Sequence, residues 1–252
     1  MHMLIAYSET VAAGDVDNDI TAVSDPQLTQ QNSHHLPNRD VLLLAAYGLG
    51  ANMTTVRLET PKLREMLNPN IRPLDRAANP PDEPNVAFFL GYELTLRGGE
   101  EVVVKASNNL GAATEQATIL LWIGDRPAPA GNAPVYTLRC TYSITGVANG
   151  WASGNLTFTQ TLPSGMYDVV GMGVFGTNMV AGRLILPGYA HRPGVPGGAN
   201  AGLNMRPNFR MGNFGLFGTF TNVALPQLEI FTSAAGASSG DCYLDLIYRG
   251  RT

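Results

Sequence analysis

The stretch GANMTTVRLETP at residues 50–61 returns as GTNMVAGRLILP at residues 176–187, and this repetition decides how the chain is organised. Sliding residues 36–61 onto 162–187 without a gap gives eight identities in 26 positions. The identical pairs are Leu36/Leu162, Pro37/Pro163, Gly50/Gly176, Asn52/Asn178, Met53/Met179, Arg57/Arg183, Leu58/Leu184 and Pro61/Pro187. Solenoid repeats have units of roughly 20–50 residues, so a period of 126 residues indicates one duplicated domain.

The likeness continues outward in the same order, with small changes of offset. It matches Tyr7-Ser8 to Tyr142-Ser143, residues 70–73 to 204–207, residues 85–91 to 213–218 and residues 117–126 to 241–250. Between the halves lies DRPAPAGNAP, residues 125–134, whose Pro, Gly and Ala residues have nothing large and apolar to bury. We therefore predict a first domain at residues 1–126, a linker at 127–134 and a second domain at 135–252.

The apolar segments of each half are short, rich in β-branched and aromatic residues, and bounded by Gly, Pro and Asn. Seven or eight such segments per half predict an all-β chain of two tandem antiparallel β-sandwiches. We expect strands at 3–9, 20–24, 41–49, 54–60, 86–90, 92–97, 101–107 and 118–124, and then at 135–144, 155–162, 167–176, 181–187, 214–220, 228–233 and 242–249. Helical spacing occurs only at residues 60–69, between Pro61 and Pro69.

The repeated phrase has a local interpretation. Glycine and asparagine tolerate positive φ, so Gly50 with Asn52, and Gly176 with Asn178, predict a tight turn between two strands. We favour a hairpin kept because it folds well. A binding role for the arginines of the phrase, Arg57 and Arg183, remains the alternative.

The low content of charged residues argues against a nucleic-acid partner. Only 14% of the residues are charged, against roughly 25% in a typical soluble protein, and the net charge is −4. A weakly charged surface tolerates packing against other surfaces. Because no cluster of Lys and Arg forms a basic stripe, we do not expect a nucleic-acid partner.

The N-terminus lacks a signal-peptide pattern and no apolar run approaches 18 residues, so we expect a protein made in a cytoplasm and not inserted in a membrane.

Three alternating carboxylates, Asp15, Asp17 and Asp19, resemble the opening of a calcium loop. The pattern then breaks, because Ile20 stands where the loop needs glycine and Pro26 where it needs a bidentate glutamate. We favour a solvated turn and keep a bound divalent cation as the alternative.

No other constellation carries chemistry. His34, His35 and His191 lie in loop-like sequence, where we expect exposed side chains, and Glu100-Glu101 falls at an expected strand turn. Nucleophile-elbow, phosphate-loop and dinucleotide signatures are missing from the sequence. We therefore predict no enzyme and no catalytic, cofactor or metal site.

Cys140 falls in the first expected strand of the second half and Cys242 in its last. If those strands are neighbours, the sulfurs can approach bonding range, but a cytosolic origin favours two buried thiols. We assign four phenylalanines, Phe209, Phe214, Phe217 and Phe220, to the core and domain contacts. Trp151, flanked by glycine in an expected loop, is the aromatic residue that we expect to contact something external.

Two tandem eight-stranded sandwiches of about 120 residues, rich in Gly and Asn and with only Lys62 and Lys105 as lysines, resemble the jelly-roll proteins of virus particles. The similar families are double jelly-roll coat proteins and the cement or decoration proteins of tailed-phage capsids. The resemblance covers the whole chain and is architectural, since no family motif carries it.

The resemblance implies a capsid protein of a bacteriophage, either coat or cement, that acts through contacts with itself and other capsid proteins and needs no cofactor. Three such subunits would present six similar lobes around one axis, which implies a homotrimer in the virion. A carbohydrate-binding tandem sandwich is the alternative, and it would use an exposed aromatic platform such as Trp151 or Tyr189.

Overall fold

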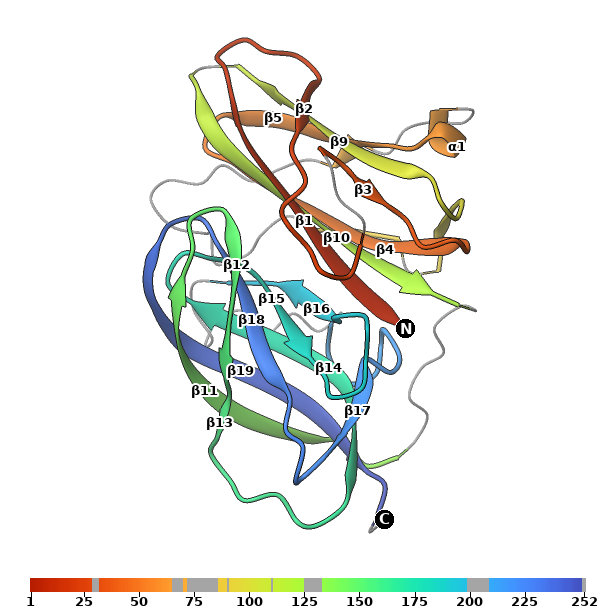
Figure 1. Cartoon of the computed structure of the whole chain (residues 1–252), viewed down its shortest axis with the longest axis vertical. Coiled ribbons are helices and arrows are strands. Elements are labelled where there is room, and N and C mark those ends of the chain that lie inside the picture. Colours follow the sequence, from red (N-terminus) through yellow and green to blue (C-terminus); the bar gives the residue numbers. More distant parts are fainter. Residues whose placement is uncertain are drawn as a thin grey trace. The chain divides into compact units, whose positions relative to one another are not determined.

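The computed structural model describes residues 1–28, 32–64, 70–71, 86–89, 91–109, 111–124, 133–198 and 209–250. Its regular structure is almost entirely β, which confirms the predicted fold class (Figure 1). The chain forms two compact units. The first unit is Ile5–Gly124, and the second combines Met1–Leu4 with Asp125–Thr252.

The first unit consists of two sheets. One sheet has the strand order β1-β10-β4-β7, with β8 also beside β4, and the other has the order β2-β9-β5-β6, with β3 also beside β9. The strands are β1 (His2–Val11), β2 (Asn18–Ile20), β3 (His34–His35), β4 (Val41–Leu49), β5 (Met53–Glu59), β6 (Asn70–Ile71), β7 (Val86–Phe88), β8 (Leu94–Leu96), β9 (Glu101–Asn108) and β10 (Ala113–Ile123).

The second unit also consists of two sheets, drawn from green to blue in Figure 1. Their strand orders are β13-β11-β19-β14-β17 and β12-β18-β15-β16. The strands are β11 (Tyr136–Gly146), β12 (Gly150–Asn155), β13 (Thr157–Phe158), β14 (Met166–Gly176), β15 (Met179–Ile185), β16 (Gly194–Pro196), β17 (Gly218–Thr221), β18 (Gln227–Thr232) and β19 (Gly236–Tyr248).

Both units have one topology once the short strands β3, β8 and β13 are set aside. Counted along the chain, eight strands remain in each unit, in the orders 1-8-3-6 and 2-7-4-5. Two facing antiparallel sheets with this order are a jelly roll. The prediction of two tandem jelly rolls related by duplication is therefore confirmed.

The sandwich cores follow from strand alternation. Along β9, Val102, Val104 and Ala106 are buried, and Val103 and Lys105 between them are more exposed. A side-chain period of two places the apolar set on the face that meets the other sheet. β4 and β14 are buried along nearly their whole length on both faces, so their sequences read as continuous apolar runs.

The repeated phrase follows the third strand of each jelly roll and contains the fourth. Those strands, β4 and β5 or β14 and β15, belong to different sheets, so the predicted hairpin is wrong. Each phrase carries the chain across the sandwich from one sheet to the other. Of the turn residues named above, Asn178 has a positive φ, 56°, whereas Gly50, Asn52 and Gly176 do not.

The predicted helical segment begins as expected. Helix α1 spans Pro61–Arg64, and the Thr60 hydroxyl accepts a hydrogen bond from the Leu63 N–H at 3.2 Å, as an N-cap residue does. Residues 65–69, the rest of the prediction, lie outside the described residues. Among the described helices, none is long and apolar enough to cross a membrane.

Candidate functional site

The arginine of the repeated phrase occupies the same place in both jelly rolls. Arg57 lies on β5 opposite Lys105 of β9, and Arg183 lies on β15 opposite Glu229 of β18. In both units these are the fourth and seventh strands. Each arginine is on the opposite face of its sheet from the buried leucine that follows it, so it belongs to the outer face of the sandwich.

In the first unit the outer face is a network of ion pairs. Arg57 Nη2 lies 3.0 Å from Asp17 Oδ2 and 2.8 Å from Glu59 Oε1. Arg64, at the end of α1, reaches the other oxygen of Glu59 at 3.1 Å. The Arg57 side chain retains 27% exposure, so water screens these pairs and each adds little to stability.

The three alternating aspartates lie beside this network. Asp17 pairs with Arg57 as described, and Asp19 pairs with Lys105 Nζ at 2.6 Å. Asp15 accepts a hydrogen bond from the Asn18 amide at 3.3 Å. Two of the three carboxylates are therefore neutralised by the protein's own cations, and Asp19 lies in β2 and not in a turn. Among the described residues, no three His, Cys, Asp or Glu side chains are grouped to hold a metal ion.

In the second unit the corresponding arginine is fully buried. Arg183 Nε donates to Glu229 Oε2 at 2.5 Å, and its Nη1 donates to the Leu4 carbonyl oxygen at 2.8 Å. The Nη1 of Arg192 donates to both oxygens of Glu229 at 2.7 Å. Charge-assisted hydrogen bonds of this kind offset the cost of removing a guanidinium from water.

Both arginine side chains extend across the seventh strand and contact a residue in or next to the second strand. Asp19 faces Lys105 and Ser153 faces Glu229, so Asp17 and Trp151, each two residues earlier, occupy corresponding positions. Arg57 pairs with Asp17, and the Arg183 guanidinium carbon lies 3.8 Å from the centre of the Trp151 ring. An ion pair in one copy is thus a cation–π contact in the other.

Trp151 contacts two residues of its own unit. Its ring stacks under Arg183 and lies 5.4 Å from the buried Phe231 ring. Trp151 also lies in β12, not in a loop. Tyr189, the other candidate platform, accepts a hydrogen bond on its hydroxyl from the Thr219 N–H at 3.1 Å.

Residues 2–4 are buried in the second unit, which no sequence pattern indicated. The His2 ring lies 4.3 Å from the Phe217 ring and hydrogen-bonds the Phe214 carbonyl oxygen at 2.6 Å. Leu4 donates its N–H to the Arg192 carbonyl oxygen at 3.0 Å. Burial lowers the pKa of His2 to about 3, so this histidine is neutral at physiological pH.

A second buried ion pair was also missed. Arg210 donates to both oxygens of Asp245 on β19 at 2.6 Å, and the Met211 N–H donates to the same carboxylate at 2.9 Å. Burial opposes the charged carboxylate, but these hydrogen bonds outweigh burial and lower the pKa of Asp245. The pair fixes the segment around residues 209–212 against β19. Its partners are 35 residues apart, and no spacing signal links them.

The histidine predictions were partly wrong. His34 is fully buried in β3, where its ring stacks edge-on against Tyr7 at 5.0 Å and its Nε2 lies 3.2 Å from the Ala6 carbonyl oxygen. His35 and His191 are partly exposed. A short strand paired with β9 draws His34 inward, although its neighbouring sequence is polar.

The aromatic and cysteine assignments match the structure. Each of the four phenylalanines assigned to the core is at most 3% exposed. Cys140 and Cys242 are buried free thiols on neighbouring strands. Glu100 lies beside the turn before β9, where it accepts a hydrogen bond from the Lys62 N–H at 3.2 Å.

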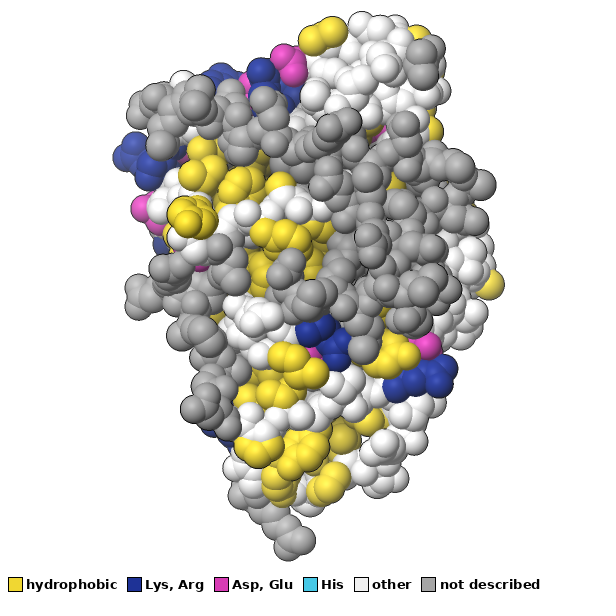
Figure 2. All heavy atoms as spheres, turned by 180° about the vertical axis from the view of Figure 1, so that it is seen from behind, with side chains coloured by type: hydrophobic (Ala, Val, Ile, Leu, Met, Phe, Trp, Pro, Cys, Tyr) yellow, Lys and Arg dark blue, Asp and Glu magenta, His cyan; other side chains and the backbone are white. Residues whose placement is uncertain are grey.

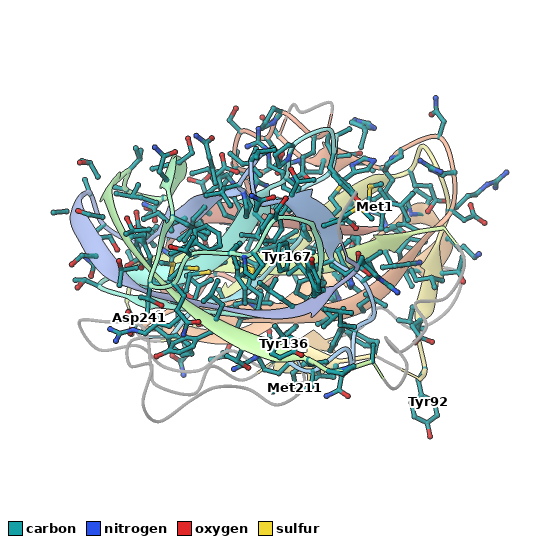
Figure 3. All side chains as sticks on the ribbon, turned by 90° about the horizontal axis from the view of Figure 1, so that it is seen from below. Met1, Tyr92, Tyr136, Tyr167, Met211 and Asp241 are labelled. Carbon is teal, nitrogen blue, oxygen red and sulfur yellow. The ribbon has the colours of Figure 1, made fainter. Side chains whose placement is uncertain are left out.

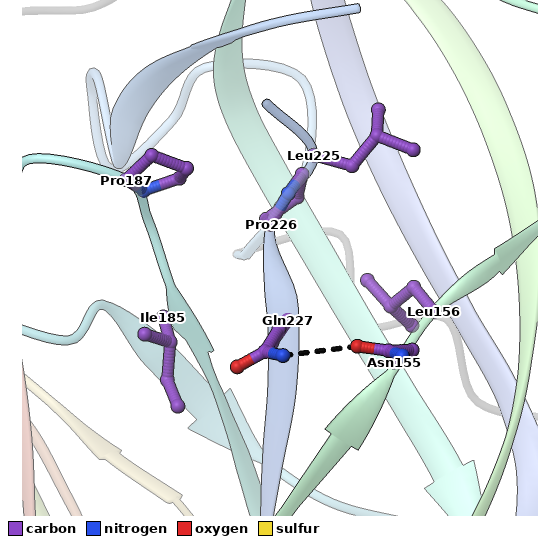
Figure 4. Close-up of a pocket in the computed structure, with 7 residues that line it drawn as sticks. All are labelled: Asn155, Leu156, Ile185, Pro187, Leu225, Pro226 and Gln227. Atoms are coloured by element: carbon purple, nitrogen blue, oxygen red, sulfur yellow. Dashed lines mark hydrogen bonds between the residues drawn. The ribbon is translucent and has the colours of Figure 1, made fainter. Parts of the chain in front are cut away.

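An open groove lies at one end of the β12-β18-β15-β16 sheet of the second unit (Figure 4). It has a volume of about 440 Å³, and its lining includes Asn155 and Gln227, whose side-chain amides are hydrogen-bonded at 2.9 Å. Apolar side chains complete it: Leu156, Ile185, Pro187, Leu225 and Pro226. Because none of the seven lining residues is ionisable, the groove can hold an apolar group but offers no acid, base or nucleophile.

Apolar side chains are also exposed outside the groove. Figure 2 shows hydrophobic side chains in several groups on one face, with few charged ones between them. The most exposed large ones are Tyr92 at 88%, Val223 at 87% and Val16 at 77%, and Tyr92 extends away from the ribbon in Figure 3. Val223 lies two residues before Leu225 of the groove.

Comparisons with known proteins give similarity at the level of structure only. No protein-family model matches the chain, and no curated protein sequence matches it. Among solved structures, the major capsid protein P2 from bacteriophage PM2 is similar, at 13% identity and a TM-score of 0.26, over 100% of this chain and 99% of that chain. A TM-score this low carries no information about function, and we therefore infer function from this chain's own strands and surfaces.

Proposed function

We propose that the protein is a structural subunit of a virus particle, either a coat subunit or a cement subunit that stabilises the capsid, and that it acts through protein–protein contacts. The observation that carries the proposal is the repetition of one eight-strand jelly-roll order in both units. A fold alone does not define a function, so the surfaces must also be suited to assembly.

The surface properties support an assembly role. Charged residues make up 14% of the chain, and several large apolar side chains are more than half exposed. The outer-face arginines are paired internally, so neither offers a free cation to a small anionic ligand. What the described surface offers to a partner is apolar contact area and one shallow groove without ionisable groups.

The duplicated fold supports a particular stoichiometry. A chain with two similar lobes gives six lobes when three copies surround one axis, and six lobes fit a hexagonal lattice position. We propose a homotrimer in the virion of a bacteriophage, with other copies and other capsid proteins as its partners.

Carbohydrate binding receives less support. A lectin site needs an exposed aromatic face beside polar groups, but Trp151 is covered by Arg183 and the Tyr189 hydroxyl is hydrogen-bonded to Thr219. The position that corresponds to Trp151 in the first unit is held by Asp17, which is not aromatic.

Negative-stain electron microscopy of the purified protein at high concentration tests the proposal. We expect six-lobed particles, and at higher concentration sheets or shells with hexagonal spacing. The same preparation is applied to a glycan array. Isolated two-lobed particles at every concentration, together with saturable binding to one class of glycan, would overturn the structural proposal in favour of a lectin.

A further inference from the structure

The two cysteines of the chain face each other inside the second jelly roll. β11 and β19, the first and last strands of that unit, pair antiparallel, and Cys140 lies directly opposite Cys242 in their register. Both residues are completely buried, as are the apolar residues two positions away, Leu138 and Leu244. Both side chains therefore point to the core face of the sheet.

The register brings the sulfurs within reach of each other. Directly opposed residues of an antiparallel pair have Cα atoms about 4.5–5.5 Å apart, and disulfides span Cα separations of about 4.4–6.8 Å. We propose that Cys140 and Cys242 are a redox pair that forms a cross-strand disulfide between the first and last strands of the second jelly roll. The inference depends on the register alone and is independent of the proposed function.

The neighbours of the pair favour a bond within one chain. Val174 of β14 faces Cys242, and Phe158 of β13 faces Cys140, so apolar side chains flank both thiols along the sheet. No solvent path lets a cysteine of a second molecule reach either sulfur while the strands are paired, since both residues are 0% exposed. Each thiol has the other as its nearest available partner.

The reaction is a thiol–disulfide exchange with a small-molecule disulfide, for example oxidised glutathione. One protein thiol loses its proton and attacks a sulfur of glutathione disulfide, giving a mixed disulfide and one glutathione thiol. The second protein thiol loses its proton and attacks the protein-side sulfur, which releases the second glutathione thiol. Two protein thiols are oxidised, and one glutathione disulfide is reduced to two thiols.

Burial controls when the exchange occurs. It raises the pKa of Cys140 to about 12 and that of Cys242 well above its usual value, so the folded protein holds little thiolate. Exchange therefore needs a transient opening of β11 from β19. Once formed, the bond ties residue 140 to residue 242 and restricts the unfolded chain, which stabilises the folded unit.

The test incubates the protein with oxidised glutathione at increasing urea, below the unfolding midpoint, and then measures intact mass and thiol content under denaturing conditions. We expect a monomer lighter by about 2 Da with no free thiol. We also expect one peptide containing both cysteines, and a higher urea midpoint that dithiothreitol reverses. The rate should rise with urea, because opening limits it.

Single variants supply the control. Cys140→Ala and Cys242→Ala each retain one thiol, so each should gain one glutathione and keep it. If the unsubstituted protein instead accumulates two glutathiones or disulfide-linked dimers, the proposed pairing is wrong. A disulfide that lowers the urea midpoint would equally contradict it, because the strands would then be too far apart to accept the bond without strain.

Discussion

At the scale of single residues, Gly50 and Gly176 of the repeated phrase are needed because their neighbours leave no room for a Cβ atom. Their backbone conformation does not require glycine. A Cβ atom on Gly176 would lie 2.0 Å from the Tyr142 hydroxyl oxygen, and one on Gly50 would overlap the Glu115 carboxylate. The Tyr142 hydroxyl in turn donates to the Phe175 carbonyl oxygen at 2.9 Å. In each unit, the segment that crosses between the sheets thus packs against a polar side chain, Glu115 or Tyr142. A residue larger than glycine would displace that side chain.

Gly176→Ala should therefore lower the free energy of unfolding by about 1–3 kcal/mol, the usual cost of overpacking. Tyr142→Phe removes the oxygen that the new methyl group meets, so the double variant should lose less than the sum of the two single variants. Urea denaturation of the three variants measures this coupling. If the losses of the two single variants simply add in the double variant, the Tyr142 hydroxyl is not the reason that residue 176 must be glycine.

The two phrase arginines should differ in their effects on stability. Arg183→Met removes a fully buried cation and leaves the Leu4 carbonyl oxygen and Glu229 with fewer donors, so we expect a loss of about 3 kcal/mol. Arg57→Met removes a half-exposed, screened partner and should cost at most about 1 kcal/mol. Chemical denaturation of both variants compares the same repeat position in two environments. Equal losses would contradict the burial difference.

A second readout separates the cation–π contact from general destabilisation. In a Trp122→Phe background, Trp151 is the remaining tryptophan, and its emission should shift when Arg183 is replaced but not when Arg57 is. A Trp151 emission that ignores Arg183 would contradict the stacking.

At the scale of secondary structure, strands with a two-residue alternation or a long apolar run were predictable. The segment 41–49 was expected as a strand and is β4 at the same residues, because both of its faces are buried and its apolar run is interrupted only by Gly48, next to its end. β12 was missed. Gly150 and Gly154 interrupt its apolar pattern, and a Cβ atom on Gly154 would lie 2.7 Å from Ile144, so glycine is needed there for close packing.

The candidate site was predictable only in part. Repetition identified Arg57 and Arg183, but their partners Asp17, Glu229 and Trp151 lie on strands that only the sheet order brings alongside. His34 was assigned to a loop because its neighbours are polar, and pairing with β9 buries it. The arginine partners and the burial of His34 both depend on which strands pair in the folded chain. A local sequence pattern does not contain that information.

The start of β1 should make stability depend on pH. The pKa of His2 is about 3 in the folded protein and about 6.5 in an unfolded chain, so the unfolded state binds more protons between these values. The His2 contribution is complete above pH 6.5 and is lost as pH falls toward 3. Denaturation curves between pH 6.5 and 4.5 should show a loss of up to about 1.4 kcal/mol per pH unit.

His2→Phe provides the control for that slope. Phenylalanine can keep the aromatic contact with Phe217 but does not titrate, so the variant should be less stable at pH 7 and show a flatter pH profile. An unchanged slope would assign the acid sensitivity to other groups.

At the scale of the whole molecule, the two units share one strand topology but differ in the surroundings of the repeated phrase. The phrase arginine is half-exposed in the first unit and fully buried in the second. α1 begins at Pro61, whereas Pro187 begins a turn and lines an open groove. Similar lobes with different outer faces can meet different neighbours, as a lattice with unequal contacts requires.

The native mass in solution tests the central claim most directly, namely that the duplicated jelly roll is an assembly subunit. We would measure it by size-exclusion chromatography with light scattering, near neutral pH and at moderate salt, over a wide range of protein concentration. The account predicts a stable mass of three times the 26.9 kDa chain, or larger assemblies built from that trimer. A mass of 26.9 kDa at every concentration would contradict it.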